Sequence, residues 1–116
     1  MIKKLTFQLT LLAALTVLLT ACSSPVKKVT LLAEDIMWNP VTIEAKVNQP
    51  IEITVRNDGA LDHVFAVEEL EINILLSPGD VEVVDLTVDH AGTILYICTI
   101  PGHEEAGMIG QIIISD

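Results

Sequence analysis

The sequence has 116 residues, of which 51% are hydrophobic and 3% aromatic, and it contains two cysteines. This length allows one domain of ordinary size, and two cysteines exclude a scaffold that several disulfides hold together. Sixteen acidic and six basic residues give a formal charge of −10, so we expect no basic surface for nucleic acid. The excess of acidic side chains favours a partner with a basic surface instead.

The first 21 residues have the features of a secretory signal peptide. Two lysines precede an apolar stretch over residues 5–19, which is too short and too often interrupted by polar residues for a membrane span. The stretch ends in Leu-Thr-Ala-Cys, which resembles the bacterial lipobox, a motif whose cysteine receives lipid and becomes the first mature residue. We therefore expect residues 1–21 to be removed and Cys22 to be lipidated. The alternatives are an ordinary signal peptide cut near Ala21 and an uncleaved anchor.

Lipidation of Cys22 would determine both the location of the protein and the state of its second cysteine. The mature chain would keep four basic and sixteen acidic side chains, a formal charge of −12. Cys98 would then have no partner for a disulfide within the chain. Residues 22–28 are short and polar, which is typical of a tether, and residues 29–116 would form the domain. We expect an exported monomer, anchored to the cell membrane by its lipid and facing the periplasm or the exterior.

The remaining sequence predicts an all-β domain, because apolar and polar residues alternate over short runs that turn residues interrupt about every ten positions. For example, Ile51, Ile53 and Val55 alternate with polar residues, which predicts a strand with one buried face. Seven or eight short strands of this kind predict a β-sandwich. The predicted strands are residues 29–33, 42–47, 51–56, 63–67, 81–88, 93–98 and 108–115.

Two segments of this pattern are less regular, and one pair of residues outside the predicted strands is apolar. In the run over residues 81–88 the alternation changes phase between Val83 and Val84, which predicts a bulge or a bend between two sheets. Residues 68–77 fit a strand and a loop with apolar anchors equally well. Met37 and Trp38 are predicted to lie in the core.

The residues that can carry chemistry concentrate in the loop between the last two predicted strands. Cys98 ends one strand, Met108 begins the next, and His103 lies midway, a spacing of Cys-x4-His-x4-Met. Such a loop can bring a thiolate, an imidazole and a thioether to one point. A second imidazole, His63, begins an earlier strand, which a sandwich can place nearby. One cysteine, two histidines and one methionine are the ligands expected for a blue copper site, which passes single electrons.

The segment over residues 57–115 resembles the cupredoxins of the plastocyanin, auracyanin and azurin type. The resemblance rests on an Asn-x-Gly-x-x-x-His approach to His63, a Ser-Pro-Gly turn, a Gly-Thr-x-x-Tyr-x-Cys strand and the Cys-x4-His-x4-Met loop. It implies a Greek-key β-sandwich with one copper ion near one end. By this resemblance His63, Cys98 and His103 would be the equatorial ligands and Met108 the axial ligand.

One position departs from the family pattern. Better-known members have an asparagine directly after the upstream histidine, where it ties the two ligand segments together, whereas this sequence has Val64. Thr99, after the cysteine, does match. The departure removes no ligand, but hydrogen bonds around metal ligands tune a site, so the resemblance does not extend to the reduction potential or to the rigidity of the loops.

The sequence predicts an electron carrier rather than an enzyme. A binuclear copper centre needs two cysteines in the loop, and multicopper oxidases place histidines on both sides of the cysteine, whereas Cys98 is flanked by Ile97 and Thr99. His90, in the turn over residues 89–92, is not expected to be a ligand. A copper-binding module for delivery or storage and a plain interaction module are the alternatives.

The family also implies where the electron leaves. Its downstream histidine reaches the surface, so His103 would be the exit, within a small apolar patch that suits weak and fast encounters. Glu104 and Glu105 are expected to face solvent at the rim of that patch rather than to act as an acid/base pair. The expected partners are redox proteins, such as cytochromes and respiratory or photosynthetic membrane complexes. The patch would consist of Leu61, Ile100, Pro101 and Ala106, rimmed by Asp62, Glu104 and Glu105.

Overall fold

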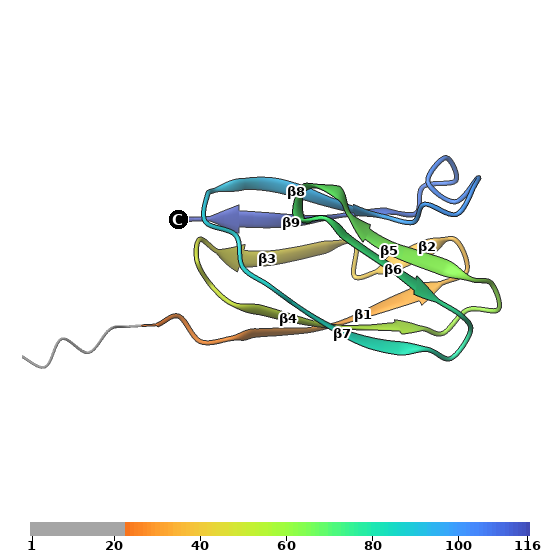
Figure 1. Ribbon diagram of the computed structural model, residues 1–116. Coiled ribbons are helices and arrows are strands. Elements are labelled where there is room, and N and C mark those ends of the chain that lie inside the picture. Colours follow the sequence, from red (N-terminus) through yellow and green to blue (C-terminus); the bar gives the residue numbers. More distant parts are fainter. Residues whose placement is uncertain (1–22) are drawn as a thin grey trace, which may run out of the picture.

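The computed structural model describes residues 23–116, which form a sandwich of two β-sheets (Figure 1). The predicted all-β sandwich is thereby confirmed, whereas the predicted signal peptide and Cys22 lie outside the described residues. The first sheet has the order β2-β1-β4-β7, and its strands are β1 (Lys27–Glu34), β2 (Met37–Asn39), β4 (Ile51–Asn57) and β7 (Val81–Leu86). The second sheet has the order β3-β9-β8-β5-β6, and its strands are β3 (Thr42–Lys46), β5 (His63–Val67), β6 (Ile72–Leu76), β8 (Gly92–Ile97) and β9 (Ile109–Ser115).

Strand pairing is mixed within both sheets. β1 runs parallel to β4, and β3 runs parallel to β9, whereas the other paired strands are antiparallel. β1 begins at Lys27, two residues before the predicted start of the domain. Within residues 23–116 there is no helix with the length and apolar character needed to cross a membrane.

The core lies between the two sheets and follows the alternation of the strands. Ile51, Ile53 and Val55 all point inward from β4 and are fully or almost fully buried. Three aromatic rings, those of Trp38, Phe65 and Tyr96, meet in the core with centroids 5.8 to 6.0 Å apart. Such edge-on and tilted contacts add to the stabilisation that burial of the rings provides.

The prediction that Met37 lies in the core is wrong, because its side chain is 46% exposed. Met37 and Trp38 are neighbours in β2, a strand of three residues at the edge of its sheet. Successive side chains of a strand point to opposite faces. Since Trp38 occupies the core, Met37 points to solvent.

The irregular segments are also resolved by the sheet pairing. β7 pairs with β4 in one continuous register from Val81 to Leu86, so there is neither a bulge between Val83 and Val84 nor a change of sheet there. The phase of the pattern changes because Val81 and Val83 are apolar side chains on the outer face. Residues 68–77 contain the 3-10 helix η1 (Glu68–Leu70) followed by β6. Together with β2, β6 brings the seven predicted strands to nine within residues 23–116.

The strand directions bring the predicted ligands to one end of the sandwich. β4 ends at Asn57 and leads into a loop before His63, the first residue of β5, while β8 and β9 are joined by the long loop at the same end (Figure 1). The described chain begins at the opposite end, since Lys27 pairs with Ile51, where β4 starts. The turn that carries His90 precedes β8 and lies at that opposite end as well.

Candidate metal centre

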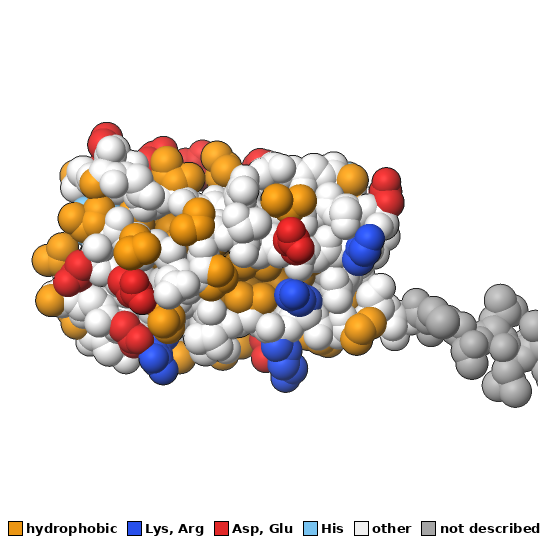
Figure 2. Space-filling model, turned by 180° about the vertical axis from the view of Figure 1, so that it is seen from behind, with side chains coloured by type: hydrophobic (Ala, Val, Ile, Leu, Met, Phe, Trp, Pro, Cys, Tyr) orange, Lys and Arg blue, Asp and Glu red, His pale blue; other side chains and the backbone are white. Residues whose placement is uncertain are grey.

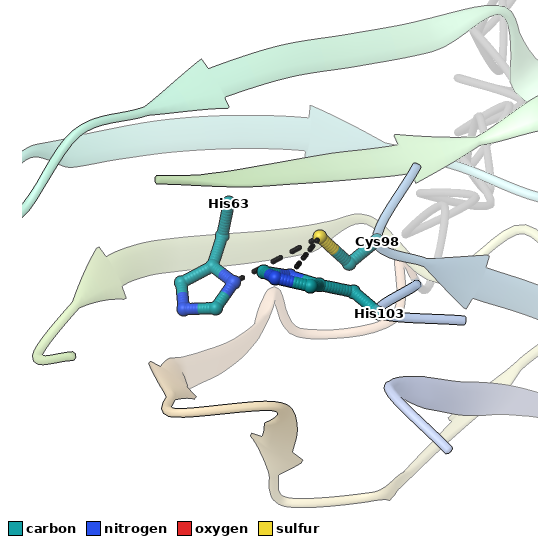
Figure 3. Close-up of side chains that lie close together, drawn as sticks. All are labelled: His63, Cys98 and His103. Carbon is teal, nitrogen blue, oxygen red and sulfur yellow. Dashed lines mark hydrogen bonds between the residues drawn. The ribbon is translucent and has the colours of Figure 1, made fainter. Parts of the chain in front are cut away.

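Three of the four predicted ligands converge at this end of the sandwich (Figure 3). His63 begins β5, Cys98 directly follows β8, and His103 lies in the loop between β8 and β9. Their ligand atoms all lie within 4.8 Å of one another, and all three residues are buried. β5 and β8 are neighbours in the same sheet, which explains how residues 35 positions apart come together.

The two imidazoles present the same atom to the thiol. Nδ1 of His63 is 3.8 Å and Nδ1 of His103 is 3.4 Å from the Cys98 sulfur. A metal bound in a plane by a thiolate at about 2.3 Å and an imidazole nitrogen at about 2.0 Å separates these two atoms by roughly 3.7 Å. The three donors are therefore spaced for one metal ion between them.

Met108 lies at the same site, immediately before β9. Its side chain is fully buried and belongs to the same hydrophobic cluster as Cys98. The backbone links the two residues directly, because the Cys98 amide donates to the Met108 carbonyl over 3.1 Å. Met108 also donates its amide to the carbonyl of His103 over 3.0 Å. The predicted set of thiolate, two imidazoles and thioether is thus collected around one loop.

The loop that carries His103 holds its own shape through backbone hydrogen bonds. The His103 amide donates to Ile100, that of Ala106 to Gly102, and that of Gly107 to Glu104, over 2.8 to 3.1 Å. Gly102 and Gly107 have φ values of 88° and 99°, which residues other than glycine rarely adopt. These bonds and turns hold the loop that carries His103 in one defined conformation.

Although Val64 stands where better-known members of the family have an asparagine, its backbone still connects the two ligand segments. The Val64 amide donates to the Cys98 sulfur over 3.4 Å. A hydrogen bond of this kind stabilises a thiolate, because it places a donor against the charged form. The Val64 side chain is 8% exposed and packs with Ala66 and Ile97, so it makes no polar contact with the ligand loops.

The environment of His63 favours its neutral, metal-binding form. Burial and the neighbouring His103 lower the pKa of His63 below its usual value, although the carboxylates of Asp35 and Asp62 act in the opposite direction. Its Nε2 is buried and makes no hydrogen bond to another residue of the described chain. A neutral imidazole has one free nitrogen lone pair, and Nδ1, which faces Cys98, can supply it to a metal.

The surface over the site combines apolar and acidic residues. His103 is 9% exposed, whereas His63 and Cys98 are fully buried. Ile100 is partly exposed. The other patch and rim residues are exposed, namely Leu61, Pro101, Ala106, Asp62, Glu104 and Glu105. Figure 2 shows apolar and acidic side chains at the end of the molecule remote from the start of the described chain.

His90 lies apart from this cluster. It is exposed and its Nδ1 lies 2.8 Å from the carboxylate of Asp89. Two residues outside the predicted ligand set support the site: Asn57 and Asp35 both bind the loop that precedes His63. Asn57 belongs to the Asn-x-Gly-x-x-x-His motif, and that motif was the available signal, whereas no pattern pointed to Asp35.

Fold and donor set together define a β-sandwich protein with the ligand arrangement of a type 1 copper site. Residues 8–114 match the Cupredoxin-like domain family, and the chain belongs to that family. Copper is therefore the cofactor of the site, in agreement with the prediction made from its cysteine, histidines and methionine.

Several solved structures share this fold. The dithionite-reduced auracyanin of the photosynthetic bacterium Roseiflexus castenholzii is 20% identical, with a TM-score of 0.67 over 78% of this chain and 98% of that chain. Auracyanin A of Chloroflexus aurantiacus, a "blue" copper protein, is 22% identical, with a TM-score of 0.62 over 78% and 99%. The periplasmic domain of cytochrome oxidase subunit II of Bradyrhizobium japonicum is 16% identical, with a TM-score of 0.64 over 76% and 83%. No curated protein matches the chain in sequence.

Proposed function

We propose that this protein is a membrane-tethered blue copper protein that carries single electrons between redox partners on the outer side of the cytoplasmic membrane. The observation that carries the proposal is the buried cluster of one thiol and two imidazoles, with the buried Met108 at the end of the loop that follows Cys98. Copper held by such ligands supplies one-electron chemistry by alternating between Cu(I) and Cu(II). Membership of the cupredoxin-like family supports this assignment.

Each ligand has a distinct function in this proposal. His63, Cys98 and His103 are the equatorial ligands, since their donor atoms face one another at the spacing of a trigonal site. Met108 would be the fourth, axial ligand, since a thioether is a weak ligand in sites of this kind. The backbone hydrogen bonds of the loop hold His103 and Met108 in place, which would limit their rearrangement when copper changes its oxidation state.

His103 is the exit for the electron in this proposal. It is the only one of the three clustered ligands with a measurable exposed surface, 9% against 0% for His63 and Cys98. The apolar patch around it, rimmed by Asp62, Glu104 and Glu105, suits a brief encounter with a partner that carries basic residues. If His103→Ala keeps copper but leaves the electron-transfer rates to every partner unchanged, this route is wrong.

The charge distribution supports a basic partner at the copper end. The three lysines of residues 23–116 are Lys27, Lys28 and Lys46, and they lie at the end where β1 starts and β3 ends. Arg56, toward the copper end, is paired with Asp58 through two hydrogen bonds of 2.6 and 2.7 Å. The remaining carboxylates near the copper site have no basic neighbour among the hydrogen bonds and ion pairs of the described chain.

We further propose that the protein functions as a monomeric electron carrier and not as an oxidase. The flanking residues of Cys98 are Ile97 and Thr99, so histidines that could connect the site to further coppers are missing at those two positions. Blue copper oxidase from Nitrosomonas europaea shares the fold at 18% identity, but this chain covers only 39% of it. The single cluster of metal-binding side chains within residues 23–116 suits transfer of one electron at a time.

The lipid anchor at Cys22 remains part of the proposal. The described chain starts at the end of the sandwich opposite the copper site (Figure 1). An anchor there would leave the copper end facing away from the membrane, accessible to partners. Incorporation of radiolabelled palmitate into the wild type and its loss in Cys22→Ser would support the anchor, and incorporation in neither would contradict it.

The proposal is tested by the visible spectrum of the chain from Ser23 onward, with Cu(II) added and then reduced by ascorbate. We expect an intense blue or green thiolate-to-copper band that bleaches on reduction and is absent from Cys98→Ser. His90→Ala is the matched control, since it removes an exposed imidazole away from the site and should leave the band unchanged. A colourless protein that binds copper weakly would contradict the carrier and favour copper delivery or storage.

A further inference from the structure

The side chain of Asn57 is a buried polar group at the end of β4, only 1% exposed. Its Nδ2 donates to the carbonyls of Leu61 and Leu76, over 2.8 and 2.9 Å, and its Oδ1 accepts the amide of Gly59 at 2.9 Å. Both amide protons and the carbonyl oxygen of this side chain are therefore used. A buried amide with this many partners fixes the segments that it connects, because each unmade bond would leave a buried polar group unpaired.

All three contacts bear on the position of His63. Gly59 and Leu61 belong to the loop that leads from β4 to His63, and Leu61 lies two residues before it. Leu76 is the residue directly opposite His63 in the pairing of β5 with β6. One side chain thus connects the end of β4, the loop before the ligand and the strand beside the ligand.

The backbone of Asn57 anchors this side chain in turn. Its amide donates to Asp80 over 3.0 Å, and its carbonyl accepts the amide of Gly79 over 2.9 Å. The residue is therefore held on both sides of its Cα by the turn between β6 and β7. This anchoring matters because a side chain can position another residue only as precisely as its own backbone is held.

A carboxylate, that of Asp35, holds the same loop from outside. Oδ1 of Asp35, in the turn between β1 and β2, accepts the amide of Ala60 over 2.9 Å. A side chain at Gly59 would overlap this carboxylate, so the loop and the turn are in close contact. The loop before His63 is therefore supported from within by Asn57 and from outside by Asp35.

We infer that Asn57 is the positioning residue for the copper ligand His63. The inference rests on the proposed function, because it assigns His63 to the metal. Asn57 acts on His63 indirectly, through its hydrogen bonds to the loop before His63 and to Leu76 of β6. The link from His63 onward to Cys98 is the amide of the next residue, Val64. Asn57 acts through other residues and touches no metal.

The test is Asn57→Leu in the full-length chain purified in detergent, since leucine has a similar shape and no hydrogen-bonding group. We expect its copper affinity to fall about tenfold to a hundredfold, as is typical when a bond that orients a ligand is lost. The visible band and the reduction potential should both shift. The matched control is Asn73→Leu, an exposed asparagine on β6, which should leave affinity, band and potential unchanged.

A copper-free readout separates this inference from the proposed function. Hydrogen exchange at the amides of Gly59 and Val64 should be faster in Asn57→Leu than in the wild type or in Asn73→Leu. If the wild type forms no blue site, the proposed function fails, while faster exchange would still show that Asn57 holds this segment. Should Asn57→Leu not fold, Asn57→Ser, which is too short to reach both carbonyls, is measured instead.

The inference is overturned by either of two results. One is a folded Asn57 variant with the affinity, spectrum and potential of the wild type, even if its melting temperature falls, because that would be a purely structural contribution. The other is unchanged exchange at Gly59 and Val64 in the copper-free protein.

Discussion

Gly110→Ala tests how closely the two strands of the copper hairpin are packed. Gly110 lies in β9 opposite Tyr96 of β8, and a Cβ atom at this position would overlap the Tyr96 ring. The ring cannot easily move aside, because it is fully buried between Trp38 and Phe65. Its hydroxyl also donates to the carbonyl of Pro40 over 2.7 Å.

The expected cost follows from these contacts. Overpacking a core of this kind costs about 1 to 3 kcal/mol, and loss of the Tyr96 hydrogen bond adds about 1 kcal/mol. Alanine restores roughly 0.5 to 1 kcal/mol, because it loses less backbone entropy than glycine when a strand forms. The net decrease in the free energy of unfolding is about 2 kcal/mol, which corresponds to a melting temperature lower by roughly 8 to 16 °C.

The assay is thermal and urea unfolding of the copper-free protein, followed by circular dichroism. The same substitution is measured in a Tyr96→Leu background, where the overlapping ring is absent and the cost of Gly110→Ala should nearly vanish. A cost below about 0.5 kcal/mol in the wild-type background, or an equal cost in both backgrounds, would refute the packing argument. Tyr96→Phe isolates the hydrogen bond to Pro40, with an expected cost of about 1 kcal/mol.

Three further predictions concern charge, pH and the metal. Electron transfer to a basic cytochrome should slow as the salt concentration increases. Glu104→Gln should weaken this salt dependence, whereas Glu44→Gln, at the other end of the sandwich, should leave it unchanged. Equal rates at low and high salt would contradict a role of the acidic rim. The folded state lowers the pKa of His63, so the unfolded chain binds its proton more readily. The copper-free protein should therefore keep its full stability above about pH 6.5 and lose stability below it, as measured by urea midpoints at pH 5 and pH 8. The difference between these midpoints should shrink in His63→Gln but persist in His90→Ala. Copper at about 1,000 times its Kd should stabilise the wild type by about 4 kcal/mol, measured as a higher melting temperature, and an equal gain in Cys98→Ser would place the metal elsewhere.

Much of the fold and site could be predicted from short stretches of sequence. The alternation around Ile53 identifies a half-buried strand because side chains of a strand point to opposite faces, and the structure confirms it. The spacing from Cys98 to Met108 identifies a metal loop because the chemistry of its side chains is local. The same reasoning was wrong for Met37 and for the phase change at Val83, since an apolar side chain can also face solvent.

Contacts between distant segments could not be predicted in the same way. The segment after Glu68 was equally compatible with a strand and a loop, and its pairing with β5 determined that it contains β6. Asp35 approaches the loop before His63 only because the turn between β1 and β2 lies beside it. Neither contact leaves a periodic pattern in the sequence.

Residue types and spacings of a few residues were enough to predict the class of the fold, the expected donor atoms and the loop that carries three of them. The distance of 3.8 Å between Nδ1 of His63 and the sulfur of Cys98, by contrast, follows from the folded arrangement of the strands. The position of Asn57, from which one amide holds the loop before that histidine, depends on the same arrangement. Both arise from the pairing of strands that are far apart in the chain, and strand pairing depends on the packing of the whole sandwich.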